Sequence, residues 1–251
     1  MIIIISPAKQ MKPEQPFKEV AIPSLHKKSE EILKVIRQCS IEDIMKLMKV
    51  KETIAKETVQ RFQDMSLDTH GYAALCTYSG LQYKSMHRED FTARDWDYAQ
   101  KHLRILSGFY GVVKPFDSIY PYRLELQCRL GVAGHRDLYS YWGDAMAQAL
   151  VSEEAYQEDS LVLNLASHEY AKAVLPYLKE NTITITFYIE KNGKLKTEST
   201  QVKMARGRMS GYLIRTQAKT LADVKAFREE GYQYQEALSS DHELVFVKQP
   251  V

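Results

Sequence analysis

The stretch that organises this chain reads Ile105-Leu-Ser-Gly-Phe-Tyr-Gly-Val-Val-Lys-Pro-Phe-Asp-Ser-Ile-Tyr-Pro-Tyr-Arg-Leu-Glu125. It begins as an apolar strand, passes two glycines and two prolines, and ends on one arginine and one carboxylate, Arg123 and Glu125. Glycine permits tight or left-handed turns, whereas proline fixes φ and cannot donate to a β-ladder. Because Phe and Tyr side chains accompany these breaks, the pattern predicts a shaped aromatic loop that delivers Arg123 and Glu125 to a fixed place.

A buried strand is predicted at the start of the chain, where Ile2–Ile5 are four consecutive isoleucines. Such a β-branched run suits a strand that is buried on both faces. It stops at Ser6-Pro-Ala-Lys9, which places a hydroxyl and a lysine at the carboxyl end of the strand. Ligands of open α/β sheets commonly bind at this edge, so Ser6 and Lys9 are candidate ligand contacts. A solvated loop lysine is the alternative interpretation of Lys9.

A second buried strand is predicted over 161–166, followed by the start of a helix. Asn164 is a polar residue inside this apolar run and must find hydrogen-bond partners. Ser167 suits the N-cap of the helix, and Glu169 lies in its first turn, where the helix dipole favours an anion. We expect Asn164 and Ser167 to line the same cleft as Ser6.

Residues 24–70 are predicted to form a helical excursion. Ser24 can cap a helix that ends near residue 39, and Ser40 opens a capping-box-like sequence for the next helix. The last two helices resemble a helix-hairpin-helix, which presents backbone amides and basic side chains to DNA phosphates. The basic side chains in question are Lys46, Lys49, Lys51 and Lys56. Because the usual glycines of the hairpin are absent, an ordinary amphipathic helix pair is the alternative.

The last third of the chain predicts a hairpin and a helix. Residues 182–189 alternate with period two, and Asn192-Gly193 is the strongest short-range signal for a β-hairpin. We expect the return strand to end near Val202 and a helix to follow over 203–216.

The fold class follows from the mixture of these elements. Long apolar strands, an alternating hairpin and several amphipathic helices predict a mixed α/β protein, with a mixed central sheet flanked by helices. No repeat, low-complexity tract or linker divides the chain, so we expect a single domain, 1–251. The other elements expected are strands over 71–78 and 244–247 and helices over 92–102 and 138–150.

The helix over 203–216 contains two glycines, Gly207 and Gly211, in a basic context. Each glycine costs about 1 kcal/mol of helix propensity relative to alanine, so close approach of another group is expected at both positions. One interpretation is tight helix packing with solvated basic flanks. The other is an anion-binding helix start at which Lys203 and Arg206 meet phosphate.

Composition excludes several classes of protein. The formal net charge is only +2, so any nucleic-acid contact needs a local basic patch. The three cysteines are far apart, which argues against a disulfide framework and a thiolate zinc site and fits a reducing compartment. Metal, dinucleotide, P-loop and serine-hydrolase motifs are all missing from the sequence. We therefore expect a cytoplasmic protein without metal or cofactor and without a membrane segment.

Several segments together resemble the YaaA family of bacterial peroxide-stress proteins. They run in order along the chain: Ser6-Pro-Ala-Lys9, Leu106-Ser-Gly-Phe-Tyr-Gly111, Pro115-Phe-Asp117, Pro121-Tyr-Arg-Leu-Glu125, Leu138-Tyr, Tyr141-Trp-Gly-Asp144, Asn164-Leu-Ala-Ser167, Glu169-Tyr170, Ala205-Arg-Gly207 and Glu243-Leu-Val-Phe246. The resemblance implies a mixed α/β fold with a helix-hairpin-helix and a positively charged DNA-binding cleft. It also implies protection from oxidative damage, in part by lowering the iron available for hydroxyl-radical chemistry.

The chain departs from the family pattern at two places. Ser79-Gly-Leu-Gln-Tyr83 lacks an acidic residue that the family usually carries there, and His168 replaces a residue that is more often small or acidic. Both departures bear on acid-dependent chemistry more than on a phosphate-binding surface.

Two hypotheses about the site follow. In the first, Lys9, Arg123, Lys203 and Arg206 converge on one basic cleft that holds the phosphates of double-stranded or structured DNA. The residues expected to line that cleft are Ser6, Tyr122, Asn164 and Ser167, and the protein is expected to act as a monomer. In the second, the same cations hold a small phosphorylated or nucleotide-like substrate of an enzyme. Its candidate acids or bases are Glu125, Asp144 and Glu169.

Overall fold

The four isoleucines that begin the chain form β1 (Ile2–Ile5), a fully buried strand inside an eight-stranded sheet. The structure is a computed structural model that describes residues 1–14, 20–67, 71–178 and 181–249. The strand order is β11-β12-β9-β8-β1-β5-β6, and β10 pairs with β9. The other strands of this sheet are β5 (Leu103–Ser107), β6 (Gly111–Val113), β8 (Val162–Leu165), β9 (Thr182–Lys191), β10 (Lys194–Lys196), β11 (Tyr232–Tyr234) and β12 (Glu243–Lys248).

The sheet is mixed, which confirms the predicted fold class. Strand β1 pairs in parallel with β5 and β8, and β9 pairs in parallel with β8 and β12. Antiparallel partners, β6 and β11, terminate the sheet at its two ends. Strands inside a parallel array are covered on both faces, which explains why β1 and β8 are continuous apolar runs.

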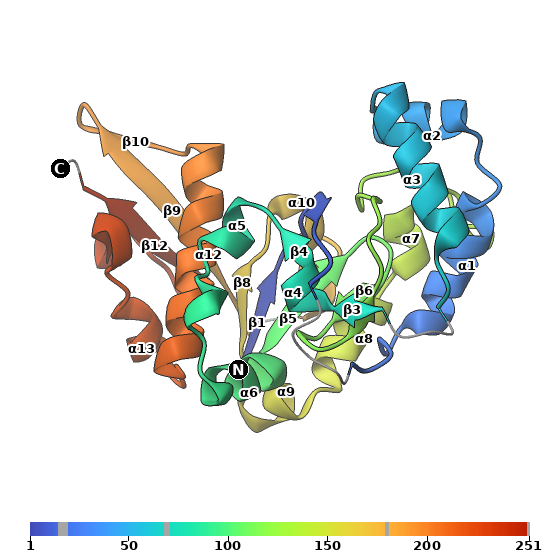
Figure 1. The fold of residues 1–251 in the computed structure, drawn as a ribbon. Coiled ribbons are helices and arrows are strands. Elements are labelled where there is room, and N and C mark those ends of the chain that lie inside the picture. Colours follow the sequence, from blue (N-terminus) through green and yellow to red (C-terminus); the bar gives the residue numbers. More distant parts are fainter. Residues whose placement is uncertain (15–19, 68–70, 179–180, 250–251) are drawn as a thin grey trace.

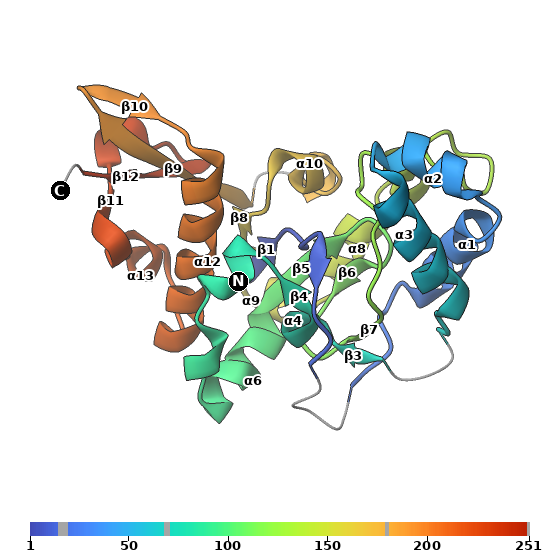
Figure 2. The same ribbon diagram turned by 45° about the horizontal axis from the view of Figure 1, so that its top comes forward.

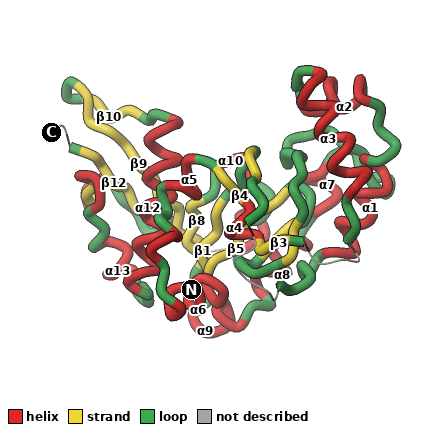
Figure 3. Tube along the Cα trace, in the orientation of Figure 1, coloured by secondary structure: helices red, strands yellow, loops and turns green. Residues whose placement is uncertain are grey.

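Helices cover this sheet, and the chain outlines a crescent (Figure 1, Figure 3). Helix α12 (Ser199–Thr216) packs against α5 (Leu81–Lys84) and α6 (Ala93–His102). Helix α8 (Ala145–Val151) packs against α9 (Glu154–Asp159) and α11 (Leu175–Leu178). Shorter helical segments are α13 (Leu221–Lys225) and the 3-10 turns Arg88–Asp90, Glu229–Gly231 and Glu236–Leu238. Among the described residues, none of the helices is long and apolar enough to cross a bilayer.

The predicted helical excursion forms one end of the crescent (Figure 2). It contains α1 (His26–Ile36), α2 (Ile41–Met48) and α3 (Glu52–Asp64), and residues 68–70 of the expected range lie outside the described residues. The capping box at Ser40 is confirmed, because its hydroxyl accepts from the amide of Asp43 and the Asp43 carboxylate accepts from the amide of Ser40. The prediction that Ser24 caps α1 is wrong, because the N-cap residue is Leu25. A turn precedes the helix there, with the His26 amide bound to the Pro23 carbonyl.

The strand predicted over 71–78 is wrong in its middle. The segment forms β3 (Tyr72–Ala73), a helical turn α4 (Ala74–Thr77) and β4 (Tyr78–Ser79). Strand β3 pairs with β7 (Ser118–Ile119), and β4 pairs with β2 (Gln10–Met11). An unbroken apolar run has no period that separates strand from helix, so the bend was invisible in the sequence. Arg88 holds the bend, since its guanidinium donates to the carbonyls of Leu75, Cys76 and Tyr78.

The single helix predicted over 138–150 is also wrong. It is divided into α7 (Leu138–Trp142) and α8, because Gly143 adopts φ 49° and ψ −126°, which is incompatible with a helix. Helix α10 (His168–Ala171) begins where it was expected, with Ser167 at its N-cap.

The hairpin at Asn192-Gly193 is confirmed, since both residues have positive φ, 53° and 71°. The return strand β10 ends at Lys196 instead of near Val202, and α12 begins at Ser199. Lys203 is therefore inside the helix. The hypothesis that Lys203 stands at an anion-binding helix start is wrong, because the free amides of the first turn lie a turn before it.

The two glycines of α12 allow a close approach of backbone to backbone. A Cβ added at Gly207 would lie 2.0 Å from the carbonyl oxygen of Gln82, and one at Gly211 would lie 2.2 Å from that of Met86. The expected close approach is thus provided by α5 and the turn that follows it.

We predict that Gly207→Ala lowers the free energy of unfolding by about 1–3 kcal/mol, because the new methyl group must push α12 away from α5. Urea denaturation measures this change. Gly131→Ala is the control, since its nearest neighbour would be 3.3 Å away. Equal stability of the two variants would contradict the proposed tight contact.

Candidate functional site

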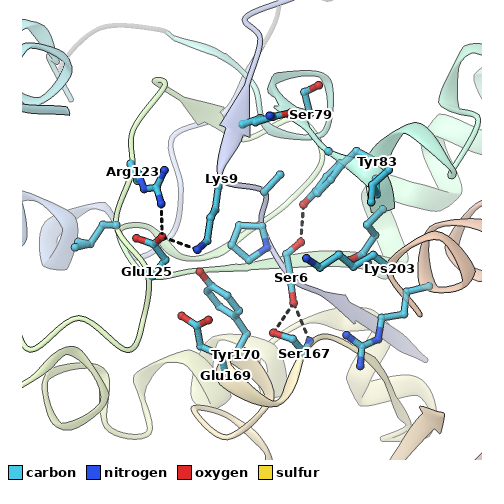
Figure 4. A pocket seen from close by; sticks show the side chains of 18 of the residues that line it. Ser6, Lys9, Ser79, Tyr83, Arg123, Glu125, Ser167, Glu169, Tyr170 and Lys203 are labelled. Atoms are coloured by element: carbon cyan, nitrogen blue, oxygen red, sulfur yellow. Dashed lines mark hydrogen bonds and ion pairs between the residues drawn. The ribbon is translucent and has the colours of Figure 1, made fainter. Parts of the chain in front are cut away.

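A cavity of about 400 Å³ lies at the carboxyl ends of β1 and β8 (Figure 4). Five separate parts of the chain line it: residues 6–10, residues 79–83, residues 122–125, the start of α10 and the middle of α12. Sheet edges of this kind are where α/β proteins bind ligands. The end of the aromatic stretch 105–125 forms one wall, which includes Arg123 and Glu125.

Ser6 and Ser167 join the ends of the two central strands. The Ser6 hydroxyl accepts from the backbone amide of Ser167 at 2.8 Å and donates to the Ser167 hydroxyl at 3.2 Å. The phenol of Tyr83 donates to the Ser6 carbonyl at 2.8 Å. Ser6 thus satisfies an amide at the start of α10, which the Ser167 side chain does not cap itself.

Asn164 finds the partners that its burial requires. Its carbonyl oxygen accepts from the amide of Ala166 at 3.0 Å, and its side-chain amide donates to the Thr184 hydroxyl at 3.2 Å. Asn164 is absent from the lining of the cavity. It instead braces the turn that positions Ser167.

Glu125 organises one end of the cavity. One of its carboxylate oxygens, Oε1, is 3.0 Å from Lys9 Nζ and 3.1 Å from an Arg123 guanidinium nitrogen. The residue is only 5% exposed, and its second oxygen has no hydrogen-bond partner among the described residues. Two of the four predicted cations are therefore already partnered by a carboxylate.

Glu169 lies close to this ion-pair group. Its carboxylate accepts from the amide of Gln127 at 3.3 Å. Burial raises the pKa of Glu169, and the charge of Glu125 raises it further. Tyr170 stands beside it, with its ring directed toward Glu125 and Lys9 (Figure 4).

Tyr122 closes the back of this wall. Its phenol oxygen is 2.8 Å from that of Tyr78 and 2.6 Å from the Ser107 hydroxyl, which forms a buried chain of three hydroxyl groups. Burial raises the pKa of Tyr122 to about 12, so the chain stays uncharged at neutral pH.

Lys203 and Arg206 form the other end of the cavity, one turn apart on α12. Among the described residues, neither makes an ion pair with an acidic side chain. Burial lowers the pKa of Arg206, and no nearby acid offsets this effect. A half-buried guanidinium without a counter-charge is a binding group for an anion.

The other predicted residues lie elsewhere. Asp144 is exposed at the start of α8 and does not line the cavity. Lys49, Lys51 and Lys56 are exposed around the α2–α3 junction, at one end of the crescent (Figure 1). Lys56 is paired with Glu52 at 2.7 Å.

Several residues that line the cavity were not predicted from the sequence, among them Gln82, Tyr83 and Tyr170. The first two lie in the segment 79–83, whose available signal was a Ser-Gly pair at the end of an apolar run. Tyr170 follows Glu169 directly, but an aromatic residue near a helix start is also ordinary core sequence.

Three side chains of the kinds that bind metal ions lie together at the surface, outside the cavity. His87, Glu89 and Asp90 place one ligand atom each within 4.8 Å of one another. The His87 ring nitrogen is already 3.2 Å from the Glu89 carboxylate. Exposed groups of this kind occur without metal, so this one carries no assignment.

The fold and the cavity define a class: a mixed α/β protein with a cation-lined cavity at the carboxyl edge of its parallel strands. A family model described as "Peroxide stress protein YaaA" matches residues 1–238. The chain is 41% identical to a UPF0246 protein of Clostridioides difficile strain 630. The alignment covers 99% of this chain and 100% of that protein. The chain is 39% identical to UPF0246 proteins of Ligilactobacillus salivarius and Desulfitobacterium hafniense, over 99% of this chain and 100% and 98% of those proteins. The chain belongs to the YaaA family of peroxide stress proteins.

We predict that Ser6→Ala lowers the free energy of unfolding by about 1–2 kcal/mol, because the Ser167 amide loses its acceptor. Ser167→Ala is the matched control, since it removes only the weaker hydroxyl contact and keeps the amide bond to Ser6. Urea denaturation of both variants measures the difference. An equal loss in the two variants would contradict this account of the strand ends.

Proposed function

We propose that this protein acts in the cytoplasm, as a monomer, by binding the phosphates of double-stranded or structured DNA during peroxide stress. Membership of the peroxide stress family provides the physiological setting. The observation that carries the binding proposal is Arg206, a half-buried guanidinium on the cavity with no acidic partner among the described residues. Lys203 beside it adds a second cation.

The charge around the cavity supports an anionic ligand. Lys9, Arg123, Lys203 and Arg206 line it together with the carboxylates Glu125 and Glu169. Four cations against two acids leave a positive excess, and the raised pKa of Glu169 enlarges that excess as the pH falls. The whole chain is nearly neutral, at a formal charge of +2, so much of its effective positive field is local.

The link to iron is a further part of the proposal. DNA phosphates hold a condensed atmosphere of cations, and a protein that neutralises phosphates releases those cations. Ferrous iron is such a cation, and it converts peroxide into radicals where it is bound. Occupying the phosphates would therefore help to limit iron-dependent damage to DNA.

The helices α2 and α3 offer a second contact surface. They pack against each other and are joined by Lys49–Lys51, with Lys49 in the left-handed conformation that glycine adopts most easily. Lys49 and Lys51 are exposed. We propose that this pair acts as a helix-hairpin-helix whose contact with the DNA backbone supplements the cavity.

We predict that Arg206→Ala weakens duplex binding by about tenfold or more and lowers the slope of affinity against salt by about one phosphate contact. Fluorescence anisotropy at two salt concentrations measures both quantities. Arg123→Ala should have the smaller effect, because Glu125 already neutralises Arg123. Lys194→Ala, an exposed cation on β10, is the control. Unchanged binding in Arg206→Ala at both salt concentrations would refute the cavity as the phosphate site.

The alternative function is an enzyme that acts on a phosphorylated or nucleotide-like substrate in the same cavity. One observation favours it: two carboxylates with different environments, Glu125 and Glu169, face the same enclosed space. Burial raises the pKa of Glu169, whereas two cations bind Glu125. A carboxyl group with a raised pKa beside an ion-paired carboxylate suits the roles of acid and base.

Glu125→Gln distinguishes the two functions. If the cavity is catalytic, this variant loses peroxide protection in cells while its DNA binding is kept or strengthened, because Lys9 and Arg123 lose their counter-charge. If the cavity only binds phosphate, the variant protects as well as the unmodified protein. Survival after peroxide exposure is the measurement, and Asp144→Asn, outside the cavity, is the matched carboxylate control.

A further inference from the structure

The cavity has two chemically different ends. Lys203 and Arg206 provide uncompensated positive charge on the α12 side. Glu125 and Glu169 provide carboxylates on the other side, and Ser6 lies between Glu125 and Lys203 (Figure 4). A bare phosphate uses only the first end. A ligand that uses both ends carries an anionic group and, at some distance from it, hydrogen-bond donors.

Four buried polar atoms of cavity-lining side chains lack partners within the described parts of the chain, and two of them are the Nε donors of Arg123 and Arg206. The other two are the Oε2 acceptor of Glu125 and the Nε2 donor of Gln82. Both residues are more than nine-tenths buried, with 5% and 8% of their surface exposed. Buried polar groups without partners are rare and unfavourable, so this pair indicates a ligand that supplies one donor and one acceptor.

Access to the carboxylate depends on Lys9. Its side chain is 62% exposed, and its ammonium group lies 3.0 Å from the Glu125 carboxylate. An exposed lysine gives up an ion pair at little cost, so an entering N–H donor can displace it from Glu125. Pro7, Leu81 and Leu124 also line the cavity, and their apolar surfaces suit a flat ring.

We propose that the cavity binds one unpaired nucleotide, with its phosphate at Lys203 and Arg206 and the donor edge of its base at Glu125. This inference rests on the proposed phosphate contact and deepens it. A cavity of about 400 Å³ has the size of a small-molecule site and cannot admit a base pair with both its strands. The nucleotide must therefore come from a bubble, an end or an extruded base of structured DNA.

The carboxylate also predicts which bases bind best. Glutamate accepts hydrogen bonds from exocyclic amino groups, such as that of cytosine. Adenine, cytosine and guanine carry such a group, whereas thymine does not. We expect the three amino-bearing bases to bind more tightly than thymine.

Isothermal titration calorimetry with dAMP, dCMP, dGMP, dTMP and inorganic phosphate tests the proposal. The amino-bearing nucleotides should bind about tenfold or more tightly than phosphate. Arg206→Ala should weaken the binding of all five ligands. Glu125→Gln, which replaces one acceptor oxygen by an amino donor, should abolish the preference for nucleotides and leave phosphate binding in place. Asp144→Asn is the control, and thermal melting verifies that each variant is folded.

The outcomes separate this inference from the proposed function when duplex binding is measured on the same protein. Duplex binding without any preference for nucleotides over phosphate overturns the nucleotide site and leaves the DNA proposal standing. A nucleotide preference that Glu125→Gln removes, without duplex binding, supports the nucleotide site and overturns the DNA proposal. A preference that persists in Glu125→Gln overturns the assignment of the base to Glu125. Absence of both kinds of binding overturns both proposals.

Discussion

A single carboxylate oxygen of Glu125 holds two cations that come from distant parts of the chain. Lys9 follows β1, and Arg123 ends the aromatic stretch that begins in β5. Burying a charge is unfavourable unless it is paired, so the two cations offset the cost of burying Glu125. The triad thereby fixes the turn after β1 against the aromatic wall. Ser6 and Tyr122, in the same two segments, are held by separate hydrogen bonds to Ser167 and Ser107.

The opposite wall depends on a different constraint, the absence of side chains at two positions of α12. Because Gly207 and Gly211 let α12 approach α5, Gln82 and Arg206 face a common space. The basic residues Lys203 and Arg206 flank the glycine contact, so tight packing and an exposed cationic surface are two faces of the same helix. Of the two interpretations offered by the sequence, the tight packing is observed and the anion-binding helix start is wrong. An anion contact of Lys203 and Arg206 within the helix is proposed.

The predictable parts of the fold were those with a strong local pattern. Local sequence alone determines three such features: the isoleucine run of β1, the Asn192-Gly193 hairpin and the capping box at Ser40. The bend inside 71–78 and the break at Gly143 could not be read, because tertiary contacts decide them. Arg88 binds carbonyl oxygens in the bend, and the positive φ of Gly143 separates α7 from α8. In the site, polar residues directly after buried strands were predictable. Gln82 and Tyr170 were not, since only the folded chain places α5 and α10 beside the same cavity.

The cavity forms only when five separate segments of the chain come together. The contacts that build the cavity join residues as distant as Ser6 and Ser167, so the loops between them must close before any of the cavity exists. Non-local contacts of this kind slow folding. Each segment contributes only part of the lining, so a truncation that removes β1 or α12 would also remove part of the cavity. The lining extends from Ser6 to Arg206, and the relatives match the chain over this whole range.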